Sequence, residues 1–324
     1  MSNRSICIGI TAYNAADSIA AAINSALSQD TEVAEIIIVD DCSSDETVAV
    51  IQTFHEQHEK IRLICHDRNQ GVAAARNTII NATTADFLAF FDDDDISLPD
   101  RVRRQRDHII EYELAHAKGA PVVCHTARTQ IYPDGTERIE PAMGSNAGEA
   151  PNGQEVLRFT LMGAKLRDGA FGACATCSQM ARLSTYRELG GFDAFFRRCE
   201  DSDLALRLAK TGGHFTGIGA PLVTQWMTGT SEKALDTLVR YSTALLEKHQ
   251  DAFESVSEYQ FSSRWLSLKY KWLSGHRWAF LFGIAQLALT NPVRTSGRLL
   301  AAYPNRKANN VFGRFARSHR SRVR

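Results

Sequence analysis

Two groups of carboxylates in this sequence are spaced for chemistry on a bound cation or on a substrate hydroxyl. The first is a run of four aspartates, Asp92–Asp95, within "FFDDDDISLPDR" (90–101). Neighbouring like charges repel, and two carboxylates about 4 Å apart near a protein surface cost roughly 4 kcal/mol at an effective dielectric of 20. An ordinary solvated loop has little reason to concentrate them, so the run predicts a bound cation.

Asp92 and Asp94 stand two residues apart, so both can face one divalent ion on a turn after a strand. Hard oxygen ligands suit Mg²⁺ or Mn²⁺, ions that also bind phosphate oxygens. The alternative is that acids near Pro99 only complement the dipole of a helix that starts there, which accounts for Asp95 but not for four aspartates. We interpret the run as a site for a divalent cation that carries a diphosphate.

The second group is "CEDSDLALRL" (199–208), where Glu200, Asp201 and Asp203 open an amphipathic helix. These acids could cap the helix and complement its dipole. One of them, aimed into a crevice, could instead act as a general base. The residue types alone leave both interpretations open.

The elements around these groups predict an α/β fold. Apolar, β-branched runs predict strands over 6–13, 35–41, 61–66, 86–93 and 121–126, and helices are expected over 17–28, 45–58, 72–82 and 100–117. Repeated β-α-β units imply a mostly parallel sheet with helices on both faces. Such sheets bind ligands at the carboxyl ends of their strands, where Thr11–Asn14, Asp40–Asp41 and Asp92–Asp95 fall.

The pattern changes after residue 128. "YPDGTE" (132–137) predicts a hairpin turn, 140–155 has the composition of a mobile loop, and strands are expected over 171–183 and near 214–224. Helices are expected from Glu200, over 231–250 and over much of 255–300. The tail from Pro304 reads as frayed.

Charge is strongly divided along the 324 residues. Residues 1–258 carry 24 basic and 37 acidic side chains, a net charge of −13, while the last 66 residues carry 13 basic and no acidic ones. A basic end of this kind favours an anionic surface. A surface-lying membrane helix at 277–300 with a polybasic tail is one interpretation, and simple packing with a solvated tail is the other. Basic residues are not interleaved with aromatics as nucleic-acid binding requires, so no nucleic acid partner is expected.

Targeting signals and cysteines favour a cytoplasmic protein. The start "MSNRSICIGITAYN" lacks the pattern of a secretory signal, and the longest apolar run (278–290) has 13 residues, whereas a spanning helix needs about 20. Seven widely spread cysteines are an odd number and fit reduced thiols. "CATC" (174–177) has the spacing of a metal or redox pair, but two half-buried strand cysteines are the simpler interpretation.

Five motifs occur in an order and spacing that resemble the family 2 glycosyltransferases of GT-A fold. They are "TAYNAADSIAAAINSALSQ" (11–29), "IIIVDDCSSDET" (36–47), "NQGVAAARN" (69–77), "FFDDDDISLPDR" (90–101) and "GGFDAFFRRCEDSDLALRL" (190–208). The resemblance covers about residues 5–225. It implies a Rossmann-like, mostly parallel sheet of GT-A type with a C-terminal helical extension.

The resemblance also implies a binding segment for a nucleotide-diphosphate sugar, most simply a UDP-sugar. The base and ribose would lie against residues at the ends of the first two strands: Thr11, Ala12, Tyr13, Asn14, Asp40 and Asp41. Of these, Asp41 matches the residue that typically bonds the base. Arg76 and Asn77 lie in a stretch that flanks the nucleotide-sugar in the family.

Metal and catalytic roles are implied in the same way. Asp92 and Asp94 match the outer members of the D-x-D motif that holds Mg²⁺ or Mn²⁺, and Asp93 lies between them near the ribose and sugar. Asp201 matches the acid that serves as catalytic base, and Glu200 is its neighbour, placed to contact the acceptor. The resemblance therefore implies inverting, metal-dependent transfer of a sugar to an acceptor hydroxyl.

This interpretation divides the chain into four parts. Residues 1–127 would bind the nucleotide-sugar, 128–230 the acceptor, 231–303 would be helical and 304–324 a basic flexible tail. The Q-x-x-R-W motif of processive synthases is absent, which favours transfer of one sugar per binding event, in synthesis of a cell-surface polysaccharide or glycolipid. The implied partners are a glycan or glycolipid acceptor and an anionic membrane contacted peripherally, on its cytoplasmic face, through 277–324.

Two other functions remain as alternatives. A nucleotidyltransferase also places carboxylates and Mg²⁺ at strand ends, but it usually has a glycine-rich phosphate loop, and "TAYNAADS" contains no glycine. A catalytically silent sugar-nucleotide or membrane-binding module would lack the catalytic base, whereas Asp201 is present. A dinucleotide-dependent oxidoreductase is set aside because no G-x-G-x-x-G follows the first strand.

Overall fold

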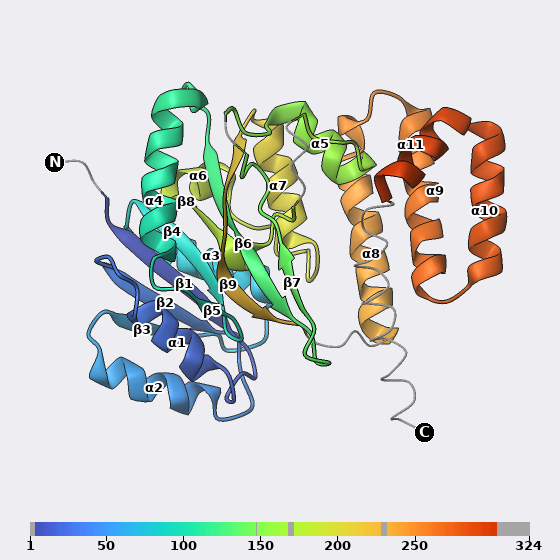
Figure 1. Ribbon diagram of the computed structural model, residues 1–324. Helices are drawn as coiled ribbons and strands as arrows, with labels where there is room; N and C mark the ends of the chain where they lie inside the picture. The colour runs from blue at the N-terminus through green and yellow to red at the C-terminus, as the bar shows by residue number, and fades with distance from the viewer. Residues whose placement is uncertain (1–3, 147, 168–171, 228–231, 303–324) are drawn as a thin grey trace. The chain divides into compact units, whose positions relative to one another are not determined.

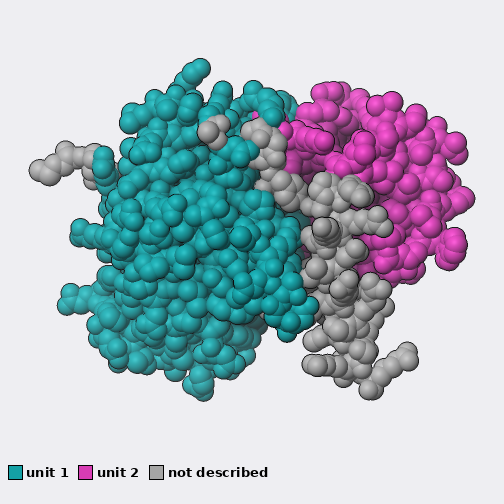
Figure 2. All heavy atoms as spheres, in the orientation of Figure 1, with its two compact units in different colours: residues 1–154, 167–227 teal, residues 155–166, 228–324 magenta. Residues whose placement is uncertain are grey.

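The computed structural model describes residues 4–146, 148–167, 172–227 and 232–302. The chain divides into two compact units (Figure 2). Unit 1 comprises residues 1–154 and 167–227, and unit 2 comprises 155–166 and 228–324. Each unit is described by itself. The basic tail expected over 304–324 lies outside the described residues.

Unit 1 is built on one mixed sheet with the strand order β3-β2-β1-β4-β8-β6-β9-β5 (Figure 1). In addition, β7 pairs with the C-terminal part of β6. The strands are β1 (Ile6–Ala12), β2 (Glu35–Asp40), β3 (Ile61–Cys65), β4 (Phe87–Asp92), β5 (Ile96–Ser97), β6 (Val122–Ile131), β7 (Glu137–Glu140), β8 (Gln179–Arg182) and β9 (His214–Trp226). Strands β3, β2, β1 and β4 are mutually parallel. The short β8 is antiparallel to both β4 and β6, so β6 and its parallel partner β9 run in the direction of β1.

The helices of unit 1 cover both faces of this sheet. They are α1 (Ile19–Leu27), α2 (Thr47–Gln57), α3 (Val72–Ala82), α4 (Arg101–Tyr112), which continues as the π-helical turn η1 (Glu113–Ala117), the short η2 (Thr176–Ser178), α6 (Leu183–Glu188) and α7 (Glu200–Lys210). Apolar side chains of α1, α2 and α4 pack in one core with alternate residues of β1, β2 and β4. Alternation along a strand sends the intervening residues to the opposite face, where α3 and α6 lie.

Close approach between α3 and the sheet depends on a glycine in β1. A Cβ atom at Gly9 would lie 2.6 Å from Cγ2 of Ile79 in α3, closer than real Cβ contacts allow. On the same face, Phe90 of β4 meets Tyr186 of α6 edge-to-face, with ring centroids 5.3 Å apart. Arg76 of α3 also reaches β4, with its guanidinium 6.0 Å from the centroid of the Phe90 ring.

Unit 2 is helical. It contains α5 (Gly153–Met162) from residue 155 onward, α8 (Glu232–Lys248), η3 (Gln250–Ala252), α9 (Val256–Leu273), α10 (Arg277–Thr290) and α11 (Pro292–Ala302). Its small core is formed by Phe261, Leu268 and Leu287 with three partly buried neighbours. Within the described part of the chain, every helix is too short or too polar to cross a membrane.

Most predicted elements are confirmed within a few residues. The helices expected over 72–82 and 100–117 are α3 and α4 with η1, the hairpin turn at 132–137 joins β6 to β7, and 255–300 is helical. The strand expected over 171–183 is wrong for its first part: among the described residues of this range, only Gln179–Arg182 forms a strand. Cys177 therefore lies in η2 and not in a strand, and every cysteine is a free thiol.

Candidate active site

The carboxyl ends of three parallel strands meet at one edge of the unit 1 sheet. In the strand register, Ala12 of β1 is paired with Asp40 of β2, and Thr11 is paired with Asp92 of β4. The polar clusters that the sequence places at three strand ends therefore lie side by side. This edge is where α/β sheets bind their ligands.

The chain leaves the sheet after β1 at this edge. Thr11 and Ala12 are buried, whereas Tyr13, the next residue, is 50% exposed. The backbone N–H of Tyr13 donates to the carboxylate of Asp93 at 2.9 Å. This bond ties the loop after β1 to the aspartate run after β4.

Three of the four non-glycine residues that have positive φ in the described ranges lie next to predicted site residues. They are Asn14 (φ 50°), Cys42 (φ 65°) and Cys199 (φ 67°). The side-chain oxygen of Asn14 accepts from the N–H of Ser44 at 2.8 Å and joins the loops after β1 and β2. Left-handed backbone at such residues is costly and persists only where the surroundings impose it, as at ligand sites.

The predicted base-binding pair, Asp40 and Asp41, is buried and shapes the neighbouring loops. Asp40 accepts from the N–H and the hydroxyl of Ser43. Asp41 accepts from the backbone N–H groups of residues 70–71 at 2.8 and 2.6 Å, and the Nδ1 atom of His66 lies 2.8 Å from its carboxylate. A contact of Asp41 with a nucleotide base stays a prediction.

A buried arginine holds both sides of the aspartate loop. Arg101, at the start of α4, is fully buried and donates to the carbonyl of Phe90 at 2.8 Å and to the hydroxyl of Ser97 at 2.7 Å. Phe90 precedes the aspartate run and Ser97 follows it. Burial lowers the pKa of Arg101 to about 10, so the group stays charged at neutral pH.

The four aspartates occupy different environments. Asp95 is only 3% exposed, Asp92 and Asp93 are partly buried, and Asp94 lies at the surface. Burial, followed by repulsion from Asp92 and Asp94, raises the pKa of Asp93 to about 7. The pKa of Asp94 is raised because nearby protein atoms reduce its hydration and Asp92 repels its charge. Burial and the same repulsion raise the pKa of Asp95.

These residues fit a divalent cation. Both carboxylate oxygens of Asp95 are buried, and neither has a hydrogen-bond partner among the described residues. One potential ligand atom each from Asp95, Asp92 and Cys177 lies within 4.8 Å of the others. A buried, unsatisfied carboxylate beside a second one is costly without a cation. A cation here would be held by Asp92 with Asp95, or by Asp92 with Asp94 as the sequence predicts.

The sequence analysis missed Asp95 and Cys177 as candidate ligands. Cys177 reaches Asp92 only through the packing of η2 against β4, and its sulfur accepts weak hydrogen bonds from Arg128 at 3.7 Å and Gln225 at 3.6 Å. The only signal for Asp95 was its place in the run of four. The signal for Cys177 is the "CATC" spacing, for which a pair of strand cysteines is the simpler interpretation.

Arg76 joins the two groups of carboxylates. Its guanidinium contacts Asp92 at 3.2 Å and Glu200 at 2.8 Å, and it lies over the ring of Phe192, 5.3 Å from the centroid. Burial acts to lower the pKa of Arg76, but the charges of Asp92 and Glu200 more than offset it, and the pKa is raised. The predicted metal and catalytic groups are therefore parts of one charged network.

Asn77, the neighbour of Arg76, holds the turn that leads to the second carboxylate group. Its side-chain amide donates to the carbonyl of Phe192 and accepts from the N–H of the same residue, both at 2.7 Å. The turn contains Gly191 at φ 71°, where a Cβ would lie 2.4 Å from the oxygen of Asn77. Contact of Asn77 with a nucleotide-sugar stays a prediction.

Glu200 and Asp201 form the first turn of α7, directly after Cys199. The carboxylate of Asp201 accepts from the N–H of Ser202 at 2.6 Å. Burial, followed by repulsion from Glu200, raises the pKa of Asp201 above that of an ordinary aspartate, with Arg76 opposing the shift. A raised pKa makes a carboxylate a stronger base while it remains ionised near neutral pH.

Asp203 has a different environment from the other two acids of this helix. It is fully buried and pairs with Arg207 at 2.8 Å, one turn along α7. Arg207 in turn donates to the carbonyls of Leu189 and Gly191. Asp203 therefore stabilises the helix and the preceding turn, which leaves Glu200 and Asp201 as the acids available for chemistry.

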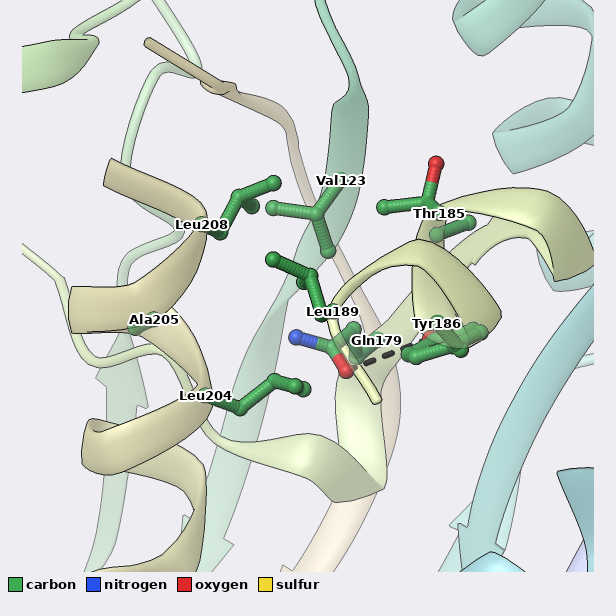
Figure 3. A pocket seen from close by; sticks show the side chains of 9 residues that line it. Val123, Gln179, Thr185, Tyr186, Leu189, Leu204, Ala205 and Leu208 are labelled. Carbon is green, nitrogen blue, oxygen red and sulfur yellow. Dashed lines mark hydrogen bonds between the residues drawn. The ribbon is translucent and has the colours of Figure 1, made fainter. Parts of the chain in front are cut away.

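A small cavity in unit 1 is not the ligand site (Figure 3). It measures about 10 Å³ and is lined mostly by apolar side chains from β6, β8, α6 and α7. Gln179 and Tyr186 share a hydrogen bond of 3.2 Å at its wall. A space of this size holds at most about one water molecule, and none of the predicted site residues lines it.

The raised pKa values predict how stability depends on pH in the presence of a chelator. Asp93 has a folded pKa of about 7 and an unfolded value near 3.9, so between these values the folded chain binds more protons and loses stability as pH rises. Asp93→Asn should therefore lose less stability than wild type between pH 5 and pH 8 in urea titrations. Burial lowers the pKa of His125, so this residue makes stability rise with pH below pH 6.5. It does so equally in both proteins and does not affect the comparison.

The control for this comparison is Asp107→Asn, which removes an acid whose side chain is 43% exposed on α4. Its stability profile should parallel that of wild type. An Asp93→Asn profile that also parallels wild type would contradict the assignment of this proton to Asp93.

Comparisons with a family model and with individual proteins agree with one another. A family model described as "Glycosyl transferase family 2" matches residues 7–187. The succinoglycan biosynthesis protein ExoO of Rhizobium meliloti is 42% identical over 113 residues, which are 35% of this chain and 30% of that protein. WfaP of Escherichia coli, a UDP-Glc:alpha-D-GlcNAc-diphosphoundecaprenol beta-1,3-glucosyltransferase, is 37% identical over 110 residues, which are 33% of this chain and 42% of WfaP. The matches thus span less than half the length of either relative.

A solved structure shares the fold over nearly the whole chain. The crystal structure of S. aureus TarS 1–349 in complex with UDP-GlcNAc superposes with a TM-score of 0.59 and 13% identity. It covers 98% of this chain and 92% of that one. At this identity the likeness shows the fold alone, and the fold includes the helical C-terminal region.

Proposed function

The chain belongs to glycosyl transferase family 2, and from this premise we propose that it is an inverting, metal-dependent enzyme that transfers one sugar from a UDP-sugar to an acceptor hydroxyl. That it is a glycosyltransferase follows from the family. The observation that carries the rest is the network in which Arg76 joins Asp92, at the strand-end edge, to Glu200, beside the proposed base.

The donor we propose is a UDP-sugar bound at the edge formed by β1, β2 and β4. Asp92, with Asp94 or Asp95, would hold Mg²⁺ or Mn²⁺, which when bound neutralises charge on the departing diphosphate. Tyr13, half exposed at the end of β1, would contact the nucleotide. WfaP takes UDP-Glc and TarS was crystallised with UDP-GlcNAc, which supports uridine as the nucleoside.

Asp201 is proposed to take the proton from the acceptor hydroxyl as that oxygen attacks the anomeric carbon from the face opposite the diphosphate, inverting it. Its raised pKa suits this role at neutral pH. Glu200, whose carboxylate pairs with Arg76, is proposed to orient the acceptor next to the base. This assignment makes α7 the meeting point of donor and acceptor.

The acceptor we propose is a glycan or glycolipid in the synthesis of a cell-surface polysaccharide. ExoO is named for succinoglycan biosynthesis, and the acceptor of WfaP is a sugar on diphosphoundecaprenol, a lipid. An acceptor of this kind supports a peripheral location on the cytoplasmic face of the membrane.

The donor site is tested by calorimetry of UDP binding with Mn²⁺ and with chelator. Wild type should bind UDP at least about tenfold more tightly with Mn²⁺, and Asp92→Asn should lose most of that gain because a ligand of the ion is missing. Asp94→Asn and Asp95→Asn distinguish the two possible partners of Asp92. Asp107→Asn should bind like wild type.

Two outcomes would count against the proposal. Equal affinity of wild type for UDP with and without Mn²⁺ would remove the metal from the function. A Mn²⁺ gain that survives all three aspartate variants would place the ion elsewhere.

A further inference from the structure

Unit 2 exposes an unusual amount of apolar surface. Of the sixteen large hydrophobic side chains that are exposed among the described residues, nine lie between residues 272 and 300. Trp278 is 85% exposed, Phe282 68% and Leu289 85%. Isolated exposed apolar side chains are common, but a concentration of this kind marks an interaction surface.

The helix α10 is apolar on two opposite faces. One face, with Phe280, Ile284 and Leu287, packs against Phe261 and Leu268 of α9. Gly283 allows the close approach, because a Cβ there would lie 2.2 Å from Leu268. This face forms the contact between the two helices, which lie side by side in Figure 1.

The opposite face of α10 is not covered by any of the described residues. Trp278, Leu281, Phe282, Ala285 and Leu289 recur at spacings of three, four and seven, so they form one stripe along the helix. All five are exposed. On α11, Val293 (82% exposed) and Leu300 (69% exposed) are also on one face, two turns apart. We call these seven residues the apolar stripe.

The charged side chains of α10 and α11, the helices that carry the apolar stripe, are all basic. Residues 259–302 contain six basic and no acidic side chains. Arg277 and Arg294 are exposed at the starts of α10 and α11, and the guanidinium of Arg277 lies over the ring of Trp272, 3.5 Å from its centroid. A protein partner would need a matching acidic and apolar face, whereas an anionic bilayer offers both properties at once.

We infer that the apolar stripe of α10 and α11 binds the surface of an anionic phospholipid bilayer, with the stripe in the acyl boundary and the neighbouring Arg277 and Arg294 at the phosphates. Tryptophan at the start of α10 suits this position, since its ring favours the membrane–water interface. This inference deepens the proposed location at a membrane and rests on it, but it does not depend on the donor or the catalytic base.

Sedimentation of the full-length protein with vesicles tests the inference. Wild type should bind vesicles of phosphatidylcholine with 30% phosphatidylglycerol at least about tenfold better than pure phosphatidylcholine, and high salt should weaken the binding. Trp278→Ser with Phe282→Ser should reduce binding to the anionic vesicles at least about tenfold. Arg277→Gln with Arg294→Gln should reduce the preference for anionic lipid.

The matched control is Leu114→Ser, which removes an apolar side chain that is 86% exposed in η1 of unit 1, and vesicle binding should not change. UDP calorimetry on each variant shows whether unit 1 remains folded and keeps failure of this inference distinct from failure of the proposed function. Helical content by circular dichroism shows whether unit 2 remains folded.

Two results would overturn the inference. One is that wild type does not bind the anionic vesicles, or that the variant carrying Trp278→Ser and Phe282→Ser binds them as well as wild type does. The other is self-association, seen by sedimentation velocity, that the same variant abolishes without any vesicle binding, because the stripe would then be an interface between copies of the chain.

Discussion

Replacing Asp201 with asparagine is expected to slow sugar transfer roughly a thousandfold, within the 10²–10⁴ range typical of a removed general base. Asparagine keeps the size of the side chain and its hydrogen bond with the N–H of Ser202, but it cannot accept the acceptor proton. Binding of UDP should not change, because Asp201 lies on α7 and the proposed donor residues lie at the strand ends. Transfer assays with saturating donor, together with UDP calorimetry, measure both quantities.

Asp201→Asn is also expected not to lower the stability of the protein. Burial and Glu200 raise the folded pKa of Asp201, so its ionised form destabilises the fold above that pKa. Asp201→Asn removes this charge, and its melting temperature at pH 8 should equal or exceed that of wild type. A melting temperature that does not fall is expected where a catalytic residue lowers the stability of the fold.

Glu200→Gln is the companion variant. Without the neighbouring negative charge the pKa of Asp201 should fall, so the acidic limb of the pH–rate profile should move to lower pH. A merely structural role for Glu200 would lower activity at every pH without moving the limb.

A sugar-transfer rate of Asp201→Asn within tenfold of the wild-type rate would exclude Asp201 as the base.

Replacing Arg76 with methionine is expected to lower the free energy of unfolding by about 3 kcal/mol, the low end of the range for breaking a buried ion pair. The side chain of Arg76 is 5% exposed and those of its partners, Asp92 and Glu200, are 29% and 13% exposed. Methionine fills the space beside Phe192 but leaves two carboxylates without their cation. The low end applies because Asp92 is partly hydrated.

Guanidinium chloride titrations measure this loss, and added Mn²⁺ sharpens the test. If Asp92 binds the ion, Mn²⁺ should restore part of the lost stability, since it supplies Asp92 with a cation in place of the missing guanidinium. Arg62→Met is the control: it breaks an ion pair with Glu35 in which the arginine is 48% exposed, and it should cost less than about 1 kcal/mol. A loss of similar size in both variants would show that Arg76 does not stabilise the site.

Local pattern was enough to predict the nucleotide-binding part of the fold. The runs that form β1, β2 and β4 are buried on both faces and therefore read as continuous apolar segments that end in polar residues. In parallel strands these ends must lie at one edge, so the sequence predicted the shared edge, and the position of β1 between β2 and β4 pairs Ala12 with Asp40 and Thr11 with Asp92.

The second half of the sheet was less predictable. The antiparallel β8 has four residues and pairs with both β4 and β6, and its direction depends on the path of the chain before it. The preceding segment reads as apolar and extended, yet Thr176–Ser178 forms a 3-10 turn. That turn brings Cys177 to Asp92 and Asp95, a contact across more than eighty residues that no local spacing encodes.

The sequence by itself determined which residues carry charge at the strand ends and at the start of α7, because spacing along strands and helices sets where local side chains can point. Only the tertiary structure decided that Asp95 faces inward while Asp94 faces solvent, that Arg76 joins Asp92 to Glu200, and that the described residues leave one apolar face of α10 uncovered. These features depend on which elements pack together over long sequence separations. Packing of that kind is decided by the burial of the whole core and not by the pattern of any one segment.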